Sequence, residues 1–161
     1  MLIAMKVVLI NGSPRKEGNT FIALSEVGTT LESKGVQTRI IDIGTKPVQG
    51  CIACNKCMEL GRCIFKGELY EAVRKGLTNA EGLIIGPPIF YAGPNGSLCA
   101  LLDRIFYSCA AMLQYKPGAA IAVCRRGGAS AAFDRPNKYF TIRNMPGVSA
   151  QDWKSVNCLI P

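Results

Sequence analysis

Short runs of apolar residues alternate along the chain with longer segments in which apolar positions recur every three or four residues. The short runs predict buried β-strands at Lys6–Ile10, Gln37–Ile43, Gly82–Gly86, Ala119–Cys124 and Met145–Val148. The longer segments predict amphipathic helices at Thr20–Lys34, Glu68–Gly76, Leu98–Leu113 and Ala129–Phe140. Strands that alternate with helices are joined by right-handed crossovers, so we expect a mainly parallel sheet.

This order of elements predicts a three-layer α/β fold, with a doubly wound parallel sheet of five strands between helices. We expect a single domain over residues 1–161, because the sequence contains no linker, repeat or low-complexity tract. Twelve residues follow Ser149, too few for a covering helix and its connection. We therefore expect the C-terminal helix to be missing and oligomerisation, as a homodimer or homotetramer, to cover the sheet face left open.

Charge and composition narrow the chemistry. The chain has 19 Lys and Arg against 11 Asp and Glu, a formal net charge of +8, which favours anionic ligands. Nucleic acid is not expected, because no aromatic residues interleave the scattered basic ones. The absence of histidine excludes a Ser/His/Asp triad and a His-ligated zinc. Without a signal peptide or an apolar run of roughly 18 residues, we expect a cytoplasmic protein with no membrane partner.

A loop with the chemistry of an anion site follows the first predicted strand. It reads Asn11-Gly-Ser-Pro-Arg-Lys-Glu-Gly-Asn-Thr20 and leads into a helix, whose first amides and positive end attract a phosphate. The spacing fits neither the dinucleotide pattern GxGxxG nor the Walker pattern, so a mononucleotide phosphate is favoured. From this segment alone, an ordinary polar strand-to-helix turn is the alternative.

Two further loops follow the third and fourth predicted strands. Gly86–Gly96 contains prolines and aromatic residues that suit a planar ring, at the sheet edge where open α/β sheets bind ligands. Cys124–Gly128 carries two arginines and two glycines. Taken singly, these segments are also consistent with packing aromatics and a solvated basic turn.

Four of the eight cysteines lie within thirteen residues, in a cysteine-rich loop over residues 50–66. Cys51, Cys54 and Cys57 have the spacing used for 4Fe-4S clusters, and Cys63 can supply a fourth thiolate. Structural zinc more often uses two CxxC pairs that are further apart. The sequence thus favours an iron-sulfur cluster and leaves free or disulfide-paired thiols and a zinc ion as alternatives.

Nearly the whole chain resembles one known family. The loop from Asn11 to Thr20 is similar to the FMN-phosphate loop of the NADPH-dependent FMN reductase family and its iron-sulfur flavoprotein relatives. Further similar motifs are Pro87-Pro-Ile-Phe90, Leu102-Asp-Arg104 and Arg125-Arg-Gly-Gly128, and the cysteine motif resembles the cluster motif of those relatives. Pro87 and Phe90 replace the usual serine and tyrosine. The resemblance implies a flavodoxin-like, FMN-binding domain with strand order 2-1-3-4-5.

The resemblance also implies roles for individual residues. The residues expected to bind FMN are Ser13, Arg15, Gly18, Asn19 and Thr20 at the phosphate, Pro88, Ile89, Phe90, Tyr91, Asn95 and Gly96 at the ring, and Arg125, Arg126 and Gly127 at its polar edge. Cys51, Cys54, Cys57 and Cys63 are expected to hold the cluster. No side chain is expected to act as an acid or base, since the flavin carries the chemistry.

The expected function is that of an FMN-dependent NAD(P)H oxidoreductase of the iron-sulfur flavoprotein type. Electrons would pass from NAD(P)H or a reduced carrier through FMN to a small-molecule or protein acceptor, such as ferredoxin. The alternatives are a non-catalytic FMN and 4Fe-4S electron-transfer protein partnered with ferredoxin, and a cysteine-based redox sensor.

Overall fold

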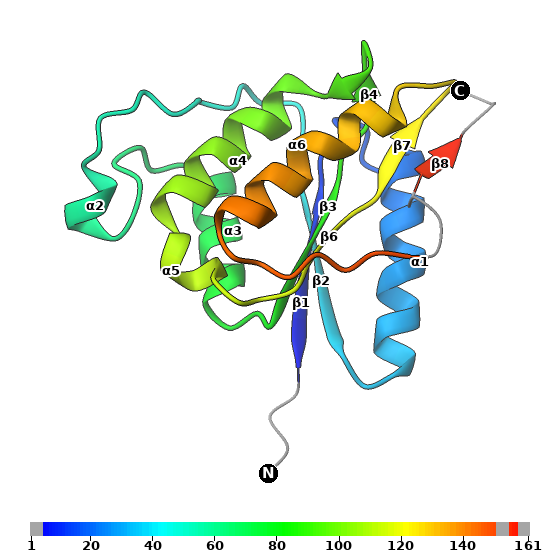
Figure 1. Ribbon diagram of the computed structural model, residues 1–161, viewed down its shortest axis with the longest axis horizontal. Helices are drawn as coiled ribbons and strands as arrows, with labels where there is room; N and C mark the ends of the chain where they lie inside the picture. The colour runs from blue at the N-terminus through cyan, green and yellow to red at the C-terminus, as the bar shows by residue number, and fades with distance from the viewer. Residues whose placement is uncertain (1–4, 151–154, 158–161) are drawn as a thin grey trace.

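Four parallel strands form the central sheet of the computed structural model, which describes residues 5–150 and 155–157 (Figure 1). The strands are β1 (Lys6–Asn11), β2 (Gln37–Asp42), β3 (Gly82–Gly86) and β6 (Gly118–Ala120), in the order β2-β1-β3-β6. The helices are α1 (Asn19–Ser33), α2 (Cys57–Leu60), α3 (Glu68–Thr78), α4 (Gly96–Ser108), α5 (Ala110–Leu113) and α6 (Ala129–Ile142). The α/β fold with a parallel sheet is confirmed.

The fourth predicted strand is divided in two. Ile121 separates β6 from β7 (Ala122–Cys124), and β7 runs beside Pro87 and Pro88 after the end of β3. The amide of Val123 donates to the carbonyl of Pro87 at 3.0 Å, but the prolines have no N–H to donate in return. The ladder is therefore incomplete at this edge, which explains the interruption.

Two separate segments lie beside β6 and β7, where the fifth strand was predicted. The predicted strand Met145–Val148 makes one isolated bridge, from Gly147 to Gly118, instead of a full ladder. A second strand that the sequence pattern did not indicate, β8 (Ser155–Asn157), pairs in parallel with β7. The first four strands have the predicted order 2-1-3-4, but the predicted five-stranded sheet is wrong among the described residues, because a single bridge and the pairing of β8 with β7 replace its fifth strand.

Most predicted helices agree with the structure to within two residues at their starts and ends. The exception is Leu98–Leu113, which is broken at Cys109 into α4 and the short α5. The pattern also missed α2 in the cysteine-rich loop and the small hairpin of β4 (Ile89–Phe90) and β5 (Gly93–Pro94). Both are too short to have a readable hydrophobic period.

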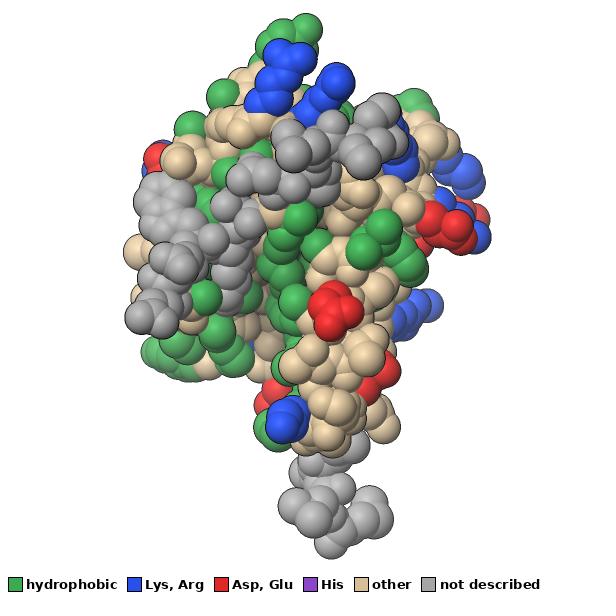
Figure 2. Space-filling model, turned by 90° about the vertical axis from the view of Figure 1, so that its right-hand side faces the viewer, with side chains coloured by type: hydrophobic (Ala, Val, Ile, Leu, Met, Phe, Trp, Pro, Cys, Tyr) green, Lys and Arg blue, Asp and Glu red, His purple; other side chains and the backbone are tan. Residues whose placement is uncertain are grey.

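The two faces of the sheet are covered unequally (Figure 1). Buried side chains of α3, α4 and α6, such as Tyr70, Leu101 and Phe140, form the larger core with one face. On the other face α1 packs through Leu24 against Leu9, Ile121 and Val123 in a smaller cluster. Figure 2, which views the molecule from the side of α1, shows hydrophobic side chains exposed among the polar ones there. The prediction that a C-terminal helix is missing concerns a segment of which residues 151–154 and 158–161 lie outside the described residues.

Among the described residues, we find no helix with both the length and the apolar character needed to cross a membrane.

The larger core should dominate stability. Leu101 on α4 is fully buried, whereas Ile142 on α6 is 71% exposed. We expect Leu101→Ala to lower the free energy of unfolding by about 2–5 kcal/mol, because it removes buried methyl groups and leaves a cavity. Ile142→Ala should change it by no more than about 0.5 kcal/mol. Urea denaturation measures both, and equal losses would contradict this description of the core.

Candidate functional site

A cavity of about 290 Å³ opens at the carboxyl ends of the strands. Open α/β sheets bind ligands at this edge, where loops after neighbouring strands converge. The loops after β1, β3 and β7 line the cavity through Ser13, Pro14, Arg15, Gly18, Asn19, Thr20, Pro88, Ile89, Phe90, Val123, Cys124 and Arg125. Three segments that are far apart in the sequence therefore meet around one space.

The register of β1 with its neighbours anchors the loop from Asn11 to Thr20. Asn11 is fully buried, and its Nδ2 donates to Oδ1 of Asp42 at 2.8 Å. Its Oδ1 accepts the N–H of Ser13, and the Ser13 Oγ accepts the N–H of Arg15, each at 3.1 Å. These successive side-chain bonds curl the loop in front of the start of α1.

Glycine is required where this loop meets β3. The amide of Gly12 donates to the carbonyl of Gly86 at 3.0 Å. A Cβ on Gly86 would lie 2.7 Å from Cδ1 of Leu24, and one on Gly12 would lie 2.6 Å from Cδ2 of Leu98. This close approach brings the start of α1 against the carboxyl end of the sheet.

The start of α1 offers hydrogen-bond donors to the cavity. The first helical bond runs from the N–H of Ile22 to the carbonyl of Gly18, so the amides of Asn19, Thr20 and Phe21 have no acceptor within the helix. Thr20 is only 3% exposed and lines the cavity, and within the described residues its hydroxyl makes no hydrogen bond. Unpaired donors at a helix N-terminus fit a phosphate group.

The walls of the cavity are two loops in contact with each other. The β4–β5 hairpin turns at Tyr91 and Ala92, which have left-handed φ values of 51° and 62°. Gly128, with a φ of 91°, ends the loop after β7, and a Cβ there would lie 2.7 Å from Cα of Ala92. The two loops therefore constrain each other, and Phe90 is held half-exposed at the edge of the cavity.

The predicted FMN-binding residues divide into two groups. Ser13, Arg15, Gly18, Asn19, Thr20, Pro88, Ile89, Phe90 and Arg125 line the cavity, whereas Tyr91, Asn95, Gly96, Arg126 and Gly127 do not. Tyr91 is fully exposed at the hairpin tip. Pro14, Val123 and Cys124 also line the cavity but were not among the predicted binding residues. Their positions inside the predicted loops and strand end were the available signal.

Asn95 has a different position from the one expected. It is 5% exposed, and its Nδ2 donates to the carbonyl of Gly12 at 2.9 Å. Its Oδ1 is buried and accepts no hydrogen bond from the described residues. Asn95, just before α4, thus supports the loop from Asn11 to Thr20 and is not part of the cavity wall.

Positive charge surrounds the mouth of the cavity. Arg15 and Arg125 line it, and Lys16 and Arg126 are exposed in the same two loops. Figure 2 shows Lys and Arg side chains gathered at the upper end of the molecule, the end at which the carboxyl ends of the strands lie in Figure 1. The charge and the free donors both suit an anionic ligand.

The four cysteines of the cysteine-rich loop line a second, narrow hollow of about 20 Å³. Between these cysteines, Ala53 and Asn55 have left-handed φ values of 54° and 58°. The amide of Ala53 donates to Sγ of Cys51 at 3.4 Å. These turns orient the loop around a common space. Within the part of the chain that the structure describes, however, no group of three or more His, Cys, Asp or Glu side chains could hold a metal ion.

The thiols influence one another. Burial raises the pKa of Cys57, and the charges of Cys51, Cys54 and Cys63 raise it further, against a lowering effect of its backbone hydrogen bond. Negative charge on several of these sulfurs at once is therefore unfavourable unless a positive charge lies nearby.

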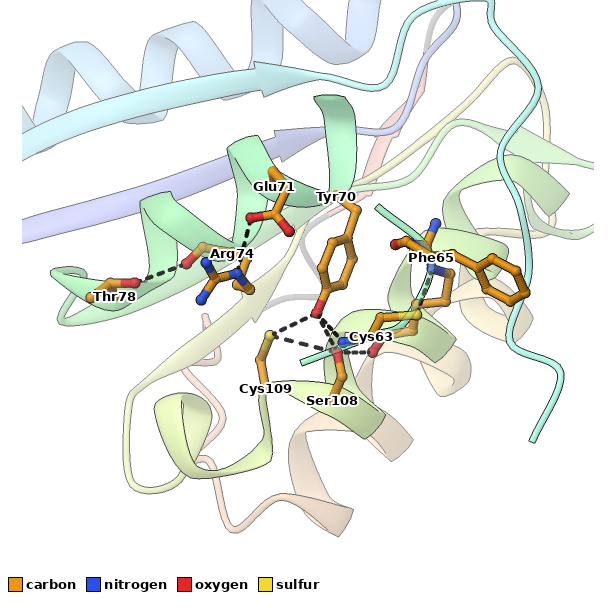
Figure 3. Close-up of polar contacts among 9 residues, drawn as sticks. Cys63, Phe65, Tyr70, Glu71, Arg74, Thr78, Ser108 and Cys109 are labelled. Atoms are coloured by element: carbon orange, nitrogen blue, oxygen red, sulfur yellow. Dashed lines mark hydrogen bonds and ion pairs between the residues drawn. The ribbon is translucent and has the colours of Figure 1, made fainter. Parts of the chain in front are cut away.

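Cys63 is held by a chain of hydrogen bonds from two helices. Its amide donates to the hydroxyl of Tyr70 at 2.9 Å, and this hydroxyl lies 2.7 Å from Oγ of Ser108. Because Ser108 donates to the carbonyl of Arg104, the Tyr70 hydroxyl is the donor to Ser108. Figure 3 shows the Tyr70 hydroxyl facing Cys63, Ser108 and Cys109. Burial raises the pKa of Tyr70, which keeps this phenol protonated as the chain requires.

The chain is similar to known proteins over most of its length. Residues 5–155 match the family model for NADPH-dependent FMN reductase. An iron-sulfur flavoprotein of Methanocaldococcus jannaschii is 34% identical over 151 residues, covering 92% of this chain and 78% of the relative.

Two solved structures show the fold. The flavoenzyme FerB of Paracoccus denitrificans, an NAD(P)H:(acceptor) oxidoreductase, has a TM-score of 0.68 at 16% identity, over 93% of this chain and 78% of its own. A flavodoxin from the domain Archaea has a TM-score of 0.63 at 18% identity, over 95% and 85%. The fold is therefore flavodoxin-like. The chain belongs to the NADPH-dependent FMN reductase and iron-sulfur flavoprotein family, a family of FMN-dependent oxidoreductases.

Proposed function

We propose that the protein oxidises NAD(P)H through FMN bound in the cavity at the carboxyl ends of the strands, and delivers the electrons to an acceptor. The observation that carries this proposal is the unpaired set of donors at the start of α1, inside a cavity with a cationic mouth. These features fit the phosphate of a mononucleotide. Membership of the NADPH-dependent FMN reductase family supports FMN as the cofactor and a reduced nicotinamide as the electron donor.

Residues of three loops would hold the cofactor. The amides of Asn19 and Thr20, the hydroxyl of Thr20 and the guanidinium of Arg15 would bind the phosphate. The ring would lie against Pro88, Ile89 and Phe90, with Arg125 at the opposite wall and Arg126 and Gly127 further along that loop. When bound, FMN supplies the electron-transfer chemistry.

The protein's own residues bind, orient and exclude water. Pro88, Val123 and Cys124 are buried walls of the cavity and keep solvent from its inner side. Phe90 lies half-exposed at the edge of the cavity, where an acceptor or the nicotinamide of the donor would approach. Arg125 places a positive charge beside the cavity, which favours an electron-rich ligand.

We also propose that Cys51, Cys54, Cys57 and Cys63 hold a 4Fe-4S cluster. The support is their spacing, their shared hollow and the relatives, which are iron-sulfur flavoproteins. Because the sulfurs are not gathered closely in this structure, cluster binding requires the exposed Cys51 and Cys54 to move toward Cys57 and Cys63. Both lie in a solvent-exposed loop without a regular strand, which permits this movement.

The remaining parts of the proposal concern location and assembly. We propose a cytoplasmic homodimer or homotetramer, with ferredoxin as a candidate protein partner. Support for assembly comes from the sheet face that α1 alone covers among the described helices, and from the exposed Ile22 on α1.

Anaerobic titration tests the central proposal. Protein purified without oxygen should contain FMN, and NADPH or NADH should bleach it rapidly. Bleaching only by reduced ferredoxin would indicate the electron-transfer protein instead. Colourless protein that refuses FMN, but changes conformation reversibly when its cysteines are oxidised, would indicate the redox sensor.

Thr20 tests the phosphate site. We expect Thr20→Val to weaken FMN binding roughly 10- to 100-fold, because a hydrogen bond to a charged group contributes about 1.5–3 kcal/mol. Thr29→Val, at an exposed position of the same helix, is the matched control and should leave the affinity unchanged. Fluorescence titration of the FMN-free protein measures both, and equal affinities for the two variants would place the phosphate elsewhere.

Cys54 tests the cysteine site. In anaerobic preparations, Cys54→Ser should lose the iron and the broad cluster absorbance while FMN is retained. Cys99→Ser on α4, which does not line the hollow, should keep both. Iron content of Cys54→Ser equal to that of the unaltered protein would show that Cys54 is not a ligand.

A further inference from the structure

Arg104 is a buried cation next to the cysteine-rich loop. Only 5% of its surface is exposed, although it carries a permanent charge. Within residues 5–150 and 155–157, no carboxylate lies within ion-pair distance of its guanidinium. Two other arginines differ in this respect, since Arg74 pairs with Glu71 and Arg135 pairs with Asp103. An unpaired buried charge is costly, so the position of Arg104 needs an explanation.

Its contacts join both ends of the cysteine-rich loop. Nη1 donates to the carbonyl of Gln49 at 3.3 Å, just before Cys51, and Nη2 donates to the carbonyl of Phe65, just after Cys63. Nε lies 3.4 Å from Sγ of Cys63, and the guanidinium carbon lies 4.6 Å from the centroid of the Tyr70 ring.

The guanidinium therefore meets a sulfur where an anionic oxygen would be expected. The carbonyls and the aromatic ring offset part of the burial cost, but they carry no negative charge. Among the described contacts of the guanidinium, the Cys63 sulfur is the group that would carry negative charge as a ligand of the proposed cluster. A planar fork is needed here, because a lysine could not reach two carbonyls and a sulfur in three fixed directions.

We propose that Arg104 is a positioning residue of the cysteine site. It closes the loop by binding Gln49 and Phe65, and it holds an N–H and a positive charge against the Cys63 sulfur. A charge and a hydrogen bond at a ligand sulfur favour the more negative, reduced state of an iron-sulfur cluster and raise its reduction potential. This inference rests on the proposed cluster and adds a residue outside the cysteine motif to its site.

The test uses the full-length chain, purified anaerobically with its FMN and supplied with iron and sulfide. The variants are Arg104→Gln and Arg104→Lys, with Arg135→Gln on α6 as the control. Three quantities are measured for each: iron bound per chain, the reduction potential of the cluster and the reduction potential of the flavin. The flavin serves as an internal reference, because Arg104 does not line the FMN cavity.

We expect Arg104→Gln to shift the cluster potential to lower values, or to lose the iron while FMN is retained. Arg104→Lys should lie between this variant and the unaltered protein, because it keeps the charge but not the fork. The flavin potential and Arg135→Gln should not change. If Arg104→Gln does not fold, a lower iron content or cluster potential in Arg104→Lys supports the proposal by itself.

Other outcomes overturn the proposal. Unaltered iron content and cluster potential in the Arg104 variants would show that this residue does not act on the cluster. An equal shift of the cluster potential in Arg135→Gln would show that the effect is not specific to Arg104. Absence of iron from the unaltered protein would be a different failure, because it removes the cluster itself and this inference with it.

Discussion

The register of β1 between β2 and β3 is the constraint on which the candidate site depends. It pairs Asn11 with Asp42 on one side and with Gly86 on the other. Asn11 can then bind Asp42 and Ser13 with its one amide, while Gly12 approaches Gly86 closely. A shift of one residue would reverse the faces of the side chains and remove the buried amide from the loop. This pairing therefore determines the positions of the loop from Asn11 to Thr20, the start of α1 and the cavity between them.

Helix α4 connects this site with the cysteine-rich loop. Asn95, immediately before the helix, donates a hydrogen bond to the carbonyl of Gly12 in the loop from Asn11 to Thr20. Arg104 and Ser108, near its other end, hold Cys63 directly and through Tyr70. Between these contacts the helix is anchored in the larger core by fully buried residues such as Leu101. One helix thus links the loop beside the cavity with the cysteine-rich loop.

The two sites differ in how far this structure prepares them. The cavity already has its donors, its apolar walls and its positive charge, because the start of α1 and short loops that follow β1, β3 and β7 supply them. The cysteine hollow is narrow, and Cys51 and Cys54 are exposed, because they come from a loop in which regular structure is confined to the four-residue α2. Short loops between packed strands and helices take their shape with the fold, whereas the longer cysteine-rich loop is held near its two ends by Arg104.

The sequence by itself determined the order of strands and helices, the loop at the start of α1 and the cysteine spacing. These features depend on local periodicity and on residues that are close together in the chain. Only the tertiary structure decided that Asn95 donates a hydrogen bond to Gly12, 83 residues away in the sequence, and that Arg104 contacts the sulfur of Cys63, 41 residues away. It also decided that the outer strand is divided between Gly147 and β8. Contacts of this kind arise from how the helices pack on the sheet, and no local pattern records that packing.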